Sequence, residues 1–119
     1  MLFDSNSTRI MLCATPTDMR KSFDGLAALT KNQLGENPLS GDLFVFVNKN
    51  RTYLKLLYFE PSGYCLWAKK LEQGKFHFEF TPEGKITMTS LQFKLMLEGW
   101  KESQFSKQKR YKSALENQP

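Results

Sequence analysis

Residues 43–71 read LFVFVNKNRTYLKLLYFEPSGYCLWAKKL and contain three β-type segments joined by two short turns. The segments 43–47, 53–59 and 64–71 are rich in leucine and aromatic side chains, and the turns between them contain Asn, Pro, Ser and Gly. Links this short predict successive antiparallel hairpins. The segment 76–80 has phenylalanine at every second position, so we expect it to be the fourth strand of the same meander.

The segment 43–47 differs from the others because it is apolar on both faces. A strand of this kind is covered on both sides in the folded protein. One cover is expected to be a helix that precedes the hairpins. The other could be a curled sheet, a second copy of the chain or another protein.

The chain before the hairpins predicts a strand followed by that helix. Residues 9–14 form a short apolar run. A helix is expected over 16–34, because apolar residues then recur at helical spacing, Thr15 can cap the helix, and Pro16 is tolerated in its first turn.

The chain after the hairpins predicts two further elements. Residues 86–88 form a short β-type stretch, and a second helix is expected over 90–100. Thr89 and Gln92 stand at the spacing of a capping box at the start of this helix.

Length and composition are those of one globular domain. The 119 residues are 40% hydrophobic and 24% charged, which excludes a fully disordered or fibrous chain. We therefore predict a single α+β domain over residues 1–100, in which an antiparallel meander of four or more strands packs against one main helix and a second helix follows. A basic, disordered tail is expected over 101–119.

The chain contains no uncharged apolar run near the roughly 20 residues of a spanning helix, and its start lacks the form of a signal peptide. A cytoplasmic protein without membrane contact is therefore expected.

The net charge of +5 is concentrated in two segments. Residues 49–70 carry five basic side chains against one acidic, and residues 101–119 carry five against two. Clustered positive charge favours a polyanionic partner, since each neutralised phosphate releases condensed counterions. The alternative is that the charge only keeps the protein in solution.

Aromatic side chains alternate with the basic ones in residues 49–70. Lys55 shares a strand face with Tyr53, and Lys69 shares one with Trp67. Lysines beside exposed rings are typical of sequence-tolerant nucleic-acid surfaces, where charge contacts the backbone and rings stack on bases. Equally, the rings could belong to the core and the lysines to the solvated surface.

A second basic pair lies in the sequence TDMRK at residues 17–21, the TDMRK segment. Arg20 could bind a phosphate or a partner carboxylate with both arms of its guanidinium. Alternatively, Asp18 or Asp24 pairs with Arg20 inside the protein.

The sequence shows no catalytic arrangement. His77 falls on the polar side of its alternating segment, and we expect it to be solvated. Cys13 and Cys65 lie in apolar segments, so core thiols are expected rather than nucleophiles, and two cysteines are too few for a zinc site or a disulfide framework. No glycine-rich phosphate loop occurs. We predict neither an enzyme nor a cofactor, metal ion or small-molecule substrate.

Three segments together resemble a known family. They are ATPTDMRKSFDGLAAL (14–29), GDLFVFVNKNRTYLKLLYFEPSGYCLWAKKLEQGKF (41–76) and LMLEGW (95–100). In this order and with these gaps, they are similar to the TnpB accessory proteins of the bacterial insertion-sequence family sixty-six. The resemblance implies a small protein that is needed for transposition, while a separate, larger transposase performs the strand transfer. It supplies no catalytic or metal-binding residues to carry over.

The preferred hypothesis is a transposition accessory protein that binds double-stranded DNA of the element, the transposase, or both. The residues expected to contact nucleic acid are basic or aromatic: Arg20, Lys21, Lys49, Arg51, Lys55, Trp67, Lys69, Lys70, Lys109 and Arg110. The alternative is a protein–protein adaptor or homodimer without direct DNA binding. Its interface would use aromatic side chains of the strands, namely Phe44, Phe46, Tyr53 and Tyr58.

Overall fold

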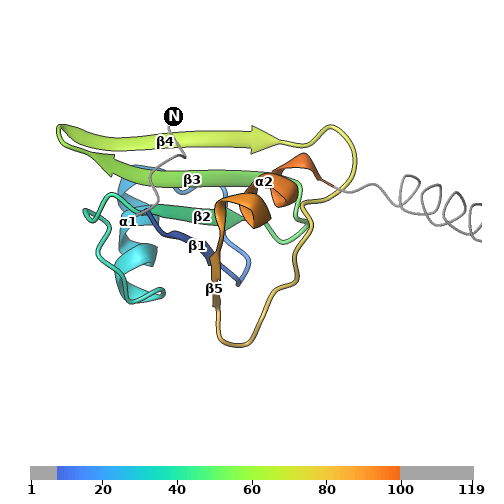
Figure 1. The fold of residues 1–119 in the computed structure, drawn as a ribbon, viewed down its shortest axis with the longest axis horizontal. Helices are drawn as coiled ribbons and strands as arrows, with labels where there is room; N and C mark the ends of the chain where they lie inside the picture. Colours follow the sequence, from blue (N-terminus) through green and yellow to red (C-terminus); the bar gives the residue numbers. More distant parts are fainter. Residues whose placement is uncertain (1–7, 100–119) are drawn as a thin grey trace, which may run out of the picture.

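Five strands and two helices make up the computed structural model, which describes residues 8–99 of the chain. In chain order, the elements are β1 (Ile10–Cys13), α1 (Phe23–Asn32), β2 (Leu43–Val47), β3 (Tyr53–Glu60), β4 (Gly63–Lys70), β5 (Lys85–Met88) and α2 (Ser90–Glu98). The strands form a mixed sheet in the order β4-β3-β2-β1-β5 (Figure 1). The α+β class predicted from the sequence is confirmed. The tail over 101–119, with Lys109 and Arg110, lies outside the described residues.

The two central hairpins have the pairing that their short turns predict. β2 and β3 are antiparallel, as are β3 and β4, and Leu57 lies opposite both Phe44 and Leu66. By contrast, β1 runs parallel to β2, with Ile10 opposite Leu43, and β5 pairs antiparallel with β1 at the far edge. Two parallel strands need a long connection, which α1 and its flanking loops provide.

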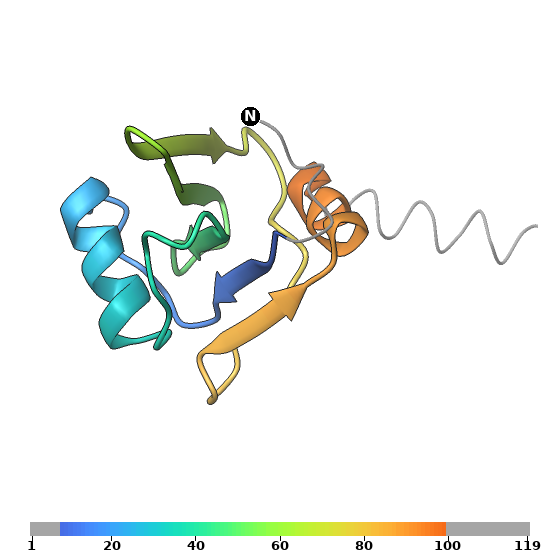
Figure 2. The same cartoon turned by 60° about the vertical axis from the view of Figure 1, so that its left-hand side comes forward.

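Both faces of β2 are buried by other parts of the same chain. α1 covers one face of the sheet, and α2 covers the other (Figure 2). The core on the α2 side contains Ile10, Leu12, Leu43, Val45, Val47, Leu54, Leu56, Phe76, Phe93 and Met96, and the core on the α1 side contains Met11, Cys13, Leu26, Leu34, Phe44, Phe46 and Leu57. The second cover that the sequence left open is therefore α2 together with the segment that contains Phe76.

Residues 76–80 do not form the expected fourth strand of the meander. They belong to a long connection that passes the ends of the central strands between β4 and β5 (Figure 1). Their backbone is bonded to the β2–β3 turn instead of to β4: the Phe76 amide donates to the Arg51 carbonyl at 2.7 Å, and the Arg51 guanidinium donates to the Phe78 carbonyl. The alternating pattern correctly indicated a buried ring at Phe76, which is fully buried, but the segment uses that ring to close the core rather than to extend the sheet.

The first helix is shorter than the sequence predicts. A helix was expected over 16–34, yet α1 begins at Phe23, and Ser22 rather than Thr15 is its N-cap residue. The Thr17 amide donates to the Val47 carbonyl at 2.9 Å, so the chain after β1 continues beside β2 and cannot turn into a helix there. The helical spacing of apolar residues correctly indicated a helix but not where it begins, because a hydrogen bond to a strand thirty residues away holds Thr17 outside it.

The second helix begins as predicted. The Thr89 hydroxyl accepts from the Gln92 amide at 3.1 Å, and the Gln92 side chain accepts from the Thr89 amide at 2.9 Å, which completes the capping box. The helix ends at Glu98, and Gly99 follows with a φ of 78°. Phe93 and Met96 are buried and fix α2 on the sheet.

Candidate nucleic-acid interface

Lys55 joins the two basic segments that the sequence singles out. Lys55 lies near the start of β3, and its ammonium donates to the carbonyls of Met19 at 2.7 Å and Lys21 at 2.8 Å. The TDMRK segment is thereby held between two anchors, the Thr17–Val47 hydrogen bond at its start and the Lys55 ammonium at its end. Segments that are more than thirty residues apart in the chain thus form one surface.

Two ammonium groups lie close to the ring of Tyr53 on this surface. The Nζ of Lys55 is 5.8 Å and the Nζ of Lys70 is 5.9 Å from the centre of its ring. Tyr53 and Lys70 are directly opposite in the β3–β4 register, on the face that α1 covers further along the sheet. We name the set Lys21, Tyr53, Lys55 and Lys70 the basic patch. The side chains of Lys21 and Lys70 are exposed.

A glycine in α1 makes room for the Lys21 side chain. A Cβ atom at Gly25 would lie 3.2 Å from both Cβ and Cγ of Lys21. The aliphatic stem of Lys21 therefore packs along the first turn of α1, and its ammonium reaches solvent. A side chain at position 25 would therefore compete with Lys21 for this space.

Arg20 pairs with Asp18 inside the protein, which is one of the two alternatives that the sequence left for it. The Arg20 guanidinium lies 2.6 Å from the Asp18 carboxylate, which also accepts from the Arg20 backbone amide at 2.9 Å. These hydrogen bonds from Arg20 lower the pKa of Asp18 to about 2. The Arg20 side chain is 91% exposed, but the pair as a whole carries no net charge. Arg20 therefore contributes less positive potential to this surface than Lys21 and Lys70.

The other predicted basic residues are divided between solvent and the fold. Lys49 is exposed in the β2–β3 turn. The Arg51 guanidinium binds the Phe78 carbonyl, and the Lys69 ammonium donates to the Leu97 carbonyl of α2 at 2.8 Å. Arg51 and Lys69 therefore fasten covering segments to the sheet, a role that composition and spacing did not reveal.

The aromatic residues predicted to contact a partner lie in different environments. Phe44 and Phe46 are fully buried beneath α1, so a partner cannot reach them in this fold, and that part of the prediction is corrected. Tyr53 and Tyr58 are half-buried, as is Trp67, which packs against the core on the α2 side. Trp67 and Tyr53 therefore lie on opposite faces of the sheet and do not form one stacking surface.

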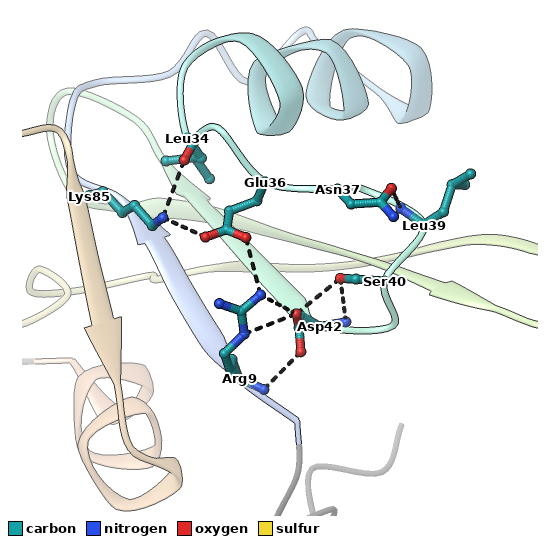
Figure 3. A network of polar contacts seen from close by, with 8 residues as sticks. All are labelled: Arg9, Leu34, Glu36, Asn37, Leu39, Ser40, Asp42 and Lys85. Carbon is teal, nitrogen blue, oxygen red and sulfur yellow. Dashed lines mark hydrogen bonds and ion pairs between the residues drawn. The ribbon is translucent and has the colours of Figure 1, made fainter.

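Sequence reasoning missed a network of ion pairs at the other end of β1 and β2 (Figure 3). The Asp42 carboxylate accepts from the Arg9 amide at 3.0 Å, from the Arg9 guanidinium at 2.9 Å and from the Ser40 hydroxyl at 3.0 Å. Glu36 binds Arg9 at 3.1 Å and Lys85 at 2.5 Å. In the sequence, a charged residue stands directly before each of two apolar strands, Arg9 before β1 and Asp42 before β2. This pattern alone does not indicate a contact, because only the parallel pairing of the two strands brings the two charges together.

The described residues offer few groups for metal binding or for thiol chemistry. Within 8–99, no group of three or more His, Cys, Asp or Glu side chains could hold a metal ion. Cys13 is buried and Cys65 is half-buried. Burial, together with a hydrogen bond to Cys65, raises the pKa of Tyr58. In the same part of the chain, the helices are too short or too polar to span a bilayer.

Comparison with known proteins gives one family. The family model described as IS66 Orf2 like protein matches residues 8–107. The chain is 37% identical over 99 residues to the uncharacterized protein y4jC of Sinorhizobium fredii, covering 83% of this chain and 85% of that protein. It is 33% identical over 106 residues to the uncharacterized protein y4hO of the same organism, covering 87% and 92% respectively. No solved structure matches the chain.

Proposed function

This chain belongs to the family of IS66 Orf2 like proteins, and we propose that it serves transposition by contacting the DNA of the insertion sequence through its basic patch. Membership of the family ties the protein to insertion-sequence transposition and to an accessory role. Direct contact with DNA is the part of this proposal that goes beyond family membership. The observation that carries it is the pair of hydrogen bonds by which Lys55 holds the TDMRK segment beside Tyr53 and Lys70.

The charges of the basic patch suit phosphate contact. Lys21 and Lys70 are exposed, and within residues 8–99 neither forms an ion pair with a carboxylate. Lys55 adds positive charge without being available itself, because two carbonyls occupy its ammonium. The ring of Tyr53 lies near two ammonium groups, which favours contact with the backbone over stacking on bases. We therefore propose that this protein binds duplex DNA with little sequence preference of its own, and that the transposase selects the site.

Charge reversal tests this proposal. The variants Lys21→Glu and Lys70→Glu are expected to weaken binding to labelled element-end DNA by roughly ten-fold each at about 50 mM salt, and to reduce the slope of log affinity against log salt by about 1 to 2. Fluorescence anisotropy across a salt titration measures both quantities. The matched control is Lys94→Glu, which makes the same charge change at an exposed site on α2, across the sheet.

Two results would refute the proposal. One is the absence of binding by the wild-type protein at about 50 mM salt, where electrostatic association is strongest. The other is an equal loss of affinity in Lys94→Glu, which would mean that only net charge matters. A scrambled duplex of the same length shows whether the protein itself prefers the element end.

A second candidate function is docking to the transposase through α2. Leu91 is 67% exposed and Leu95 is 57% exposed, one helical turn apart on the outer side of the helix. Exposed apolar pairs of this kind are typical of protein–protein contacts. This candidate is supported if a complex with the transposase resists salt, survives Lys21→Glu and Lys70→Glu, and is lost in Leu91→Ser with Leu95→Ser.

A further inference from the structure

β4 is an edge of the sheet along its whole length. It is eight residues long and pairs with β3 on one side (Figure 1). Among residues 8–99, no backbone hydrogen bond reaches its other side. A long edge of this kind is a template for another strand, and proteins usually protect it with charge, proline or a covering segment.

The β3–β4 register shows which backbone groups of β4 point outward. The Leu71 amide donates to the Thr52 carbonyl at 2.8 Å, and this pair continues the register of the two strands. Directly bonded pairs recur at every second residue of an antiparallel ladder. The residues of β4 that bond to β3 are therefore Gly63, Cys65, Trp67 and Lys69. The residues whose amide and carbonyl groups point to the free edge are Tyr64, Leu66, Ala68 and Lys70.

The charge along this edge is uneven in a way that suits a second copy of the chain. Lys69 and Lys70 are the charged residues of β4, and both are at its end. The opposite end follows the turn after Glu60. Antiparallel pairing of two copies brings the lysines of one beside the end that carries Glu60 in the other, whereas parallel pairing brings lysines together.

We propose that two copies of this protein pair through β4, antiparallel, to form one continuous sheet of ten strands. The register that uses all four outward residues of each copy has its two-fold axis at Trp67. In that register, Tyr64 pairs with the partner's Lys70 and Leu66 pairs with the partner's Ala68. Cys65 then faces the partner's Lys69 as a non-hydrogen-bonded pair, with Cα atoms about 4.5 Å apart.

This inference is independent of DNA binding, because it depends only on the edge of the sheet. Its consequence for the proposed function is geometric. The two copies of Lys70 lie six residues apart along the paired strands, about 20 Å, and on the same face of the sheet. Two basic patches on one face would bind the same DNA molecule together, which raises the overall affinity.

An engineered disulfide tests the register. In the Lys69→Cys variant, the new thiol faces the partner's Cys65 at a distance suited to a disulfide. Mild oxidation is expected to give a covalent dimer, and peptide mapping should show the link between Cys65 and position 69. The two positions are about 13 Å apart within one strand, so the link cannot form inside one chain. The control is Lys70→Cys, whose side chain lies on the other face of β4 and should not form a disulfide with Cys65.

A proline at the free edge tests the association itself. Ala68→Pro removes an amide that points outward, so the β3–β4 bonds remain. Sedimentation equilibrium of the wild-type protein is expected to give twice the 13.8 kDa of one chain. The variant should raise the dissociation constant by roughly ten-fold or more. The proposal is overturned if the wild type stays monomeric over roughly 1–200 µM, if Ala68→Pro dimerises as strongly as the wild type, or if Lys70→Cys links to Cys65 as readily as Lys69→Cys.

Discussion

Replacing Phe76 by alanine is expected to lower the free energy of unfolding by about 3–5 kcal/mol, the usual cost of removing a buried aromatic ring. Phe76 is fully buried among side chains from β1, β2 and β3 and from α2. It belongs to no strand, and its ring attaches the long connection between β4 and β5 to the core on the α2 side. Loss of the ring leaves a cavity in the core on the α2 side and releases the segment that covers it.

Urea unfolding at neutral pH measures this effect, with Phe80→Ala as the matched control. Phe80 is half-buried and packs edge-on against Phe78, with ring centres 5.0 Å apart. Its removal should cost about 1–2 kcal/mol, because it leaves no enclosed cavity. Equal losses at positions 76 and 80 would indicate that the two rings have the same role, as in a peripheral strand, and would contradict the closing role of Phe76.

Phe76 also shows what an alternating sequence pattern can and cannot specify. Alternation of phenylalanine with polar residues at 76–80 correctly indicates which side chains turn inward. It does not say whether the backbone bonds to a neighbouring strand or to a turn, because both arrangements bury every second side chain. The hairpins of residues 43–70 were predictable because their pairing is local and their turns contain the residues that turns require.

The prediction for the first part of the chain was wrong in places for a related reason. The parallel pairing of β1 with β2 joins segments about thirty residues apart, and no local pattern specifies it. That pairing fixes Thr17 beside Val47, so the helix expected over 16–34 begins only at Phe23. In the candidate site, too, local contacts were predictable and long-range contacts were not. The Arg20–Asp18 pair joins residues close in sequence and was one of the predicted alternatives. The contact of Lys55 with the TDMRK segment joins distant parts of the chain and was not predicted.

Replacing Asp42 by alanine should cost about 2–3 kcal/mol at neutral pH. The Asp42 side chain is 11% exposed and accepts hydrogen bonds from the backbone and guanidinium of Arg9 and from Ser40 (Figure 3). Its loss leaves the Arg9 amide without its acceptor at the point where β1 and β2 begin to pair. Because the Arg9 side chain is half exposed, most of the effect comes from the hydrogen bonds rather than from the ion pair. Asp18→Ala, which removes the same charge from an exposed local pair, should leave the unfolding midpoint nearly unchanged.

The contribution of Asp42 should disappear in acid, and the direction follows from its pKa. Burial alone would raise the pKa of Asp42, but the hydrogen bonds from Arg9 and Ser40 outweigh it and hold the pKa below its ordinary value of 3.8. The unfolded chain therefore takes up this proton first as the pH falls, so the stabilisation is present above pH 3.8 and is lost as the pH falls through the folded pKa. Glu36, whose pKa is lowered by the hydrogen bonds from Lys85 and Arg9, loses its contribution in the same direction. Unfolding midpoints of the wild type and Asp42→Ala should therefore differ clearly at neutral pH and converge in strong acid. A difference that stays constant from neutral pH into strong acid would mean that the charge of the Asp42 carboxylate is not the cause.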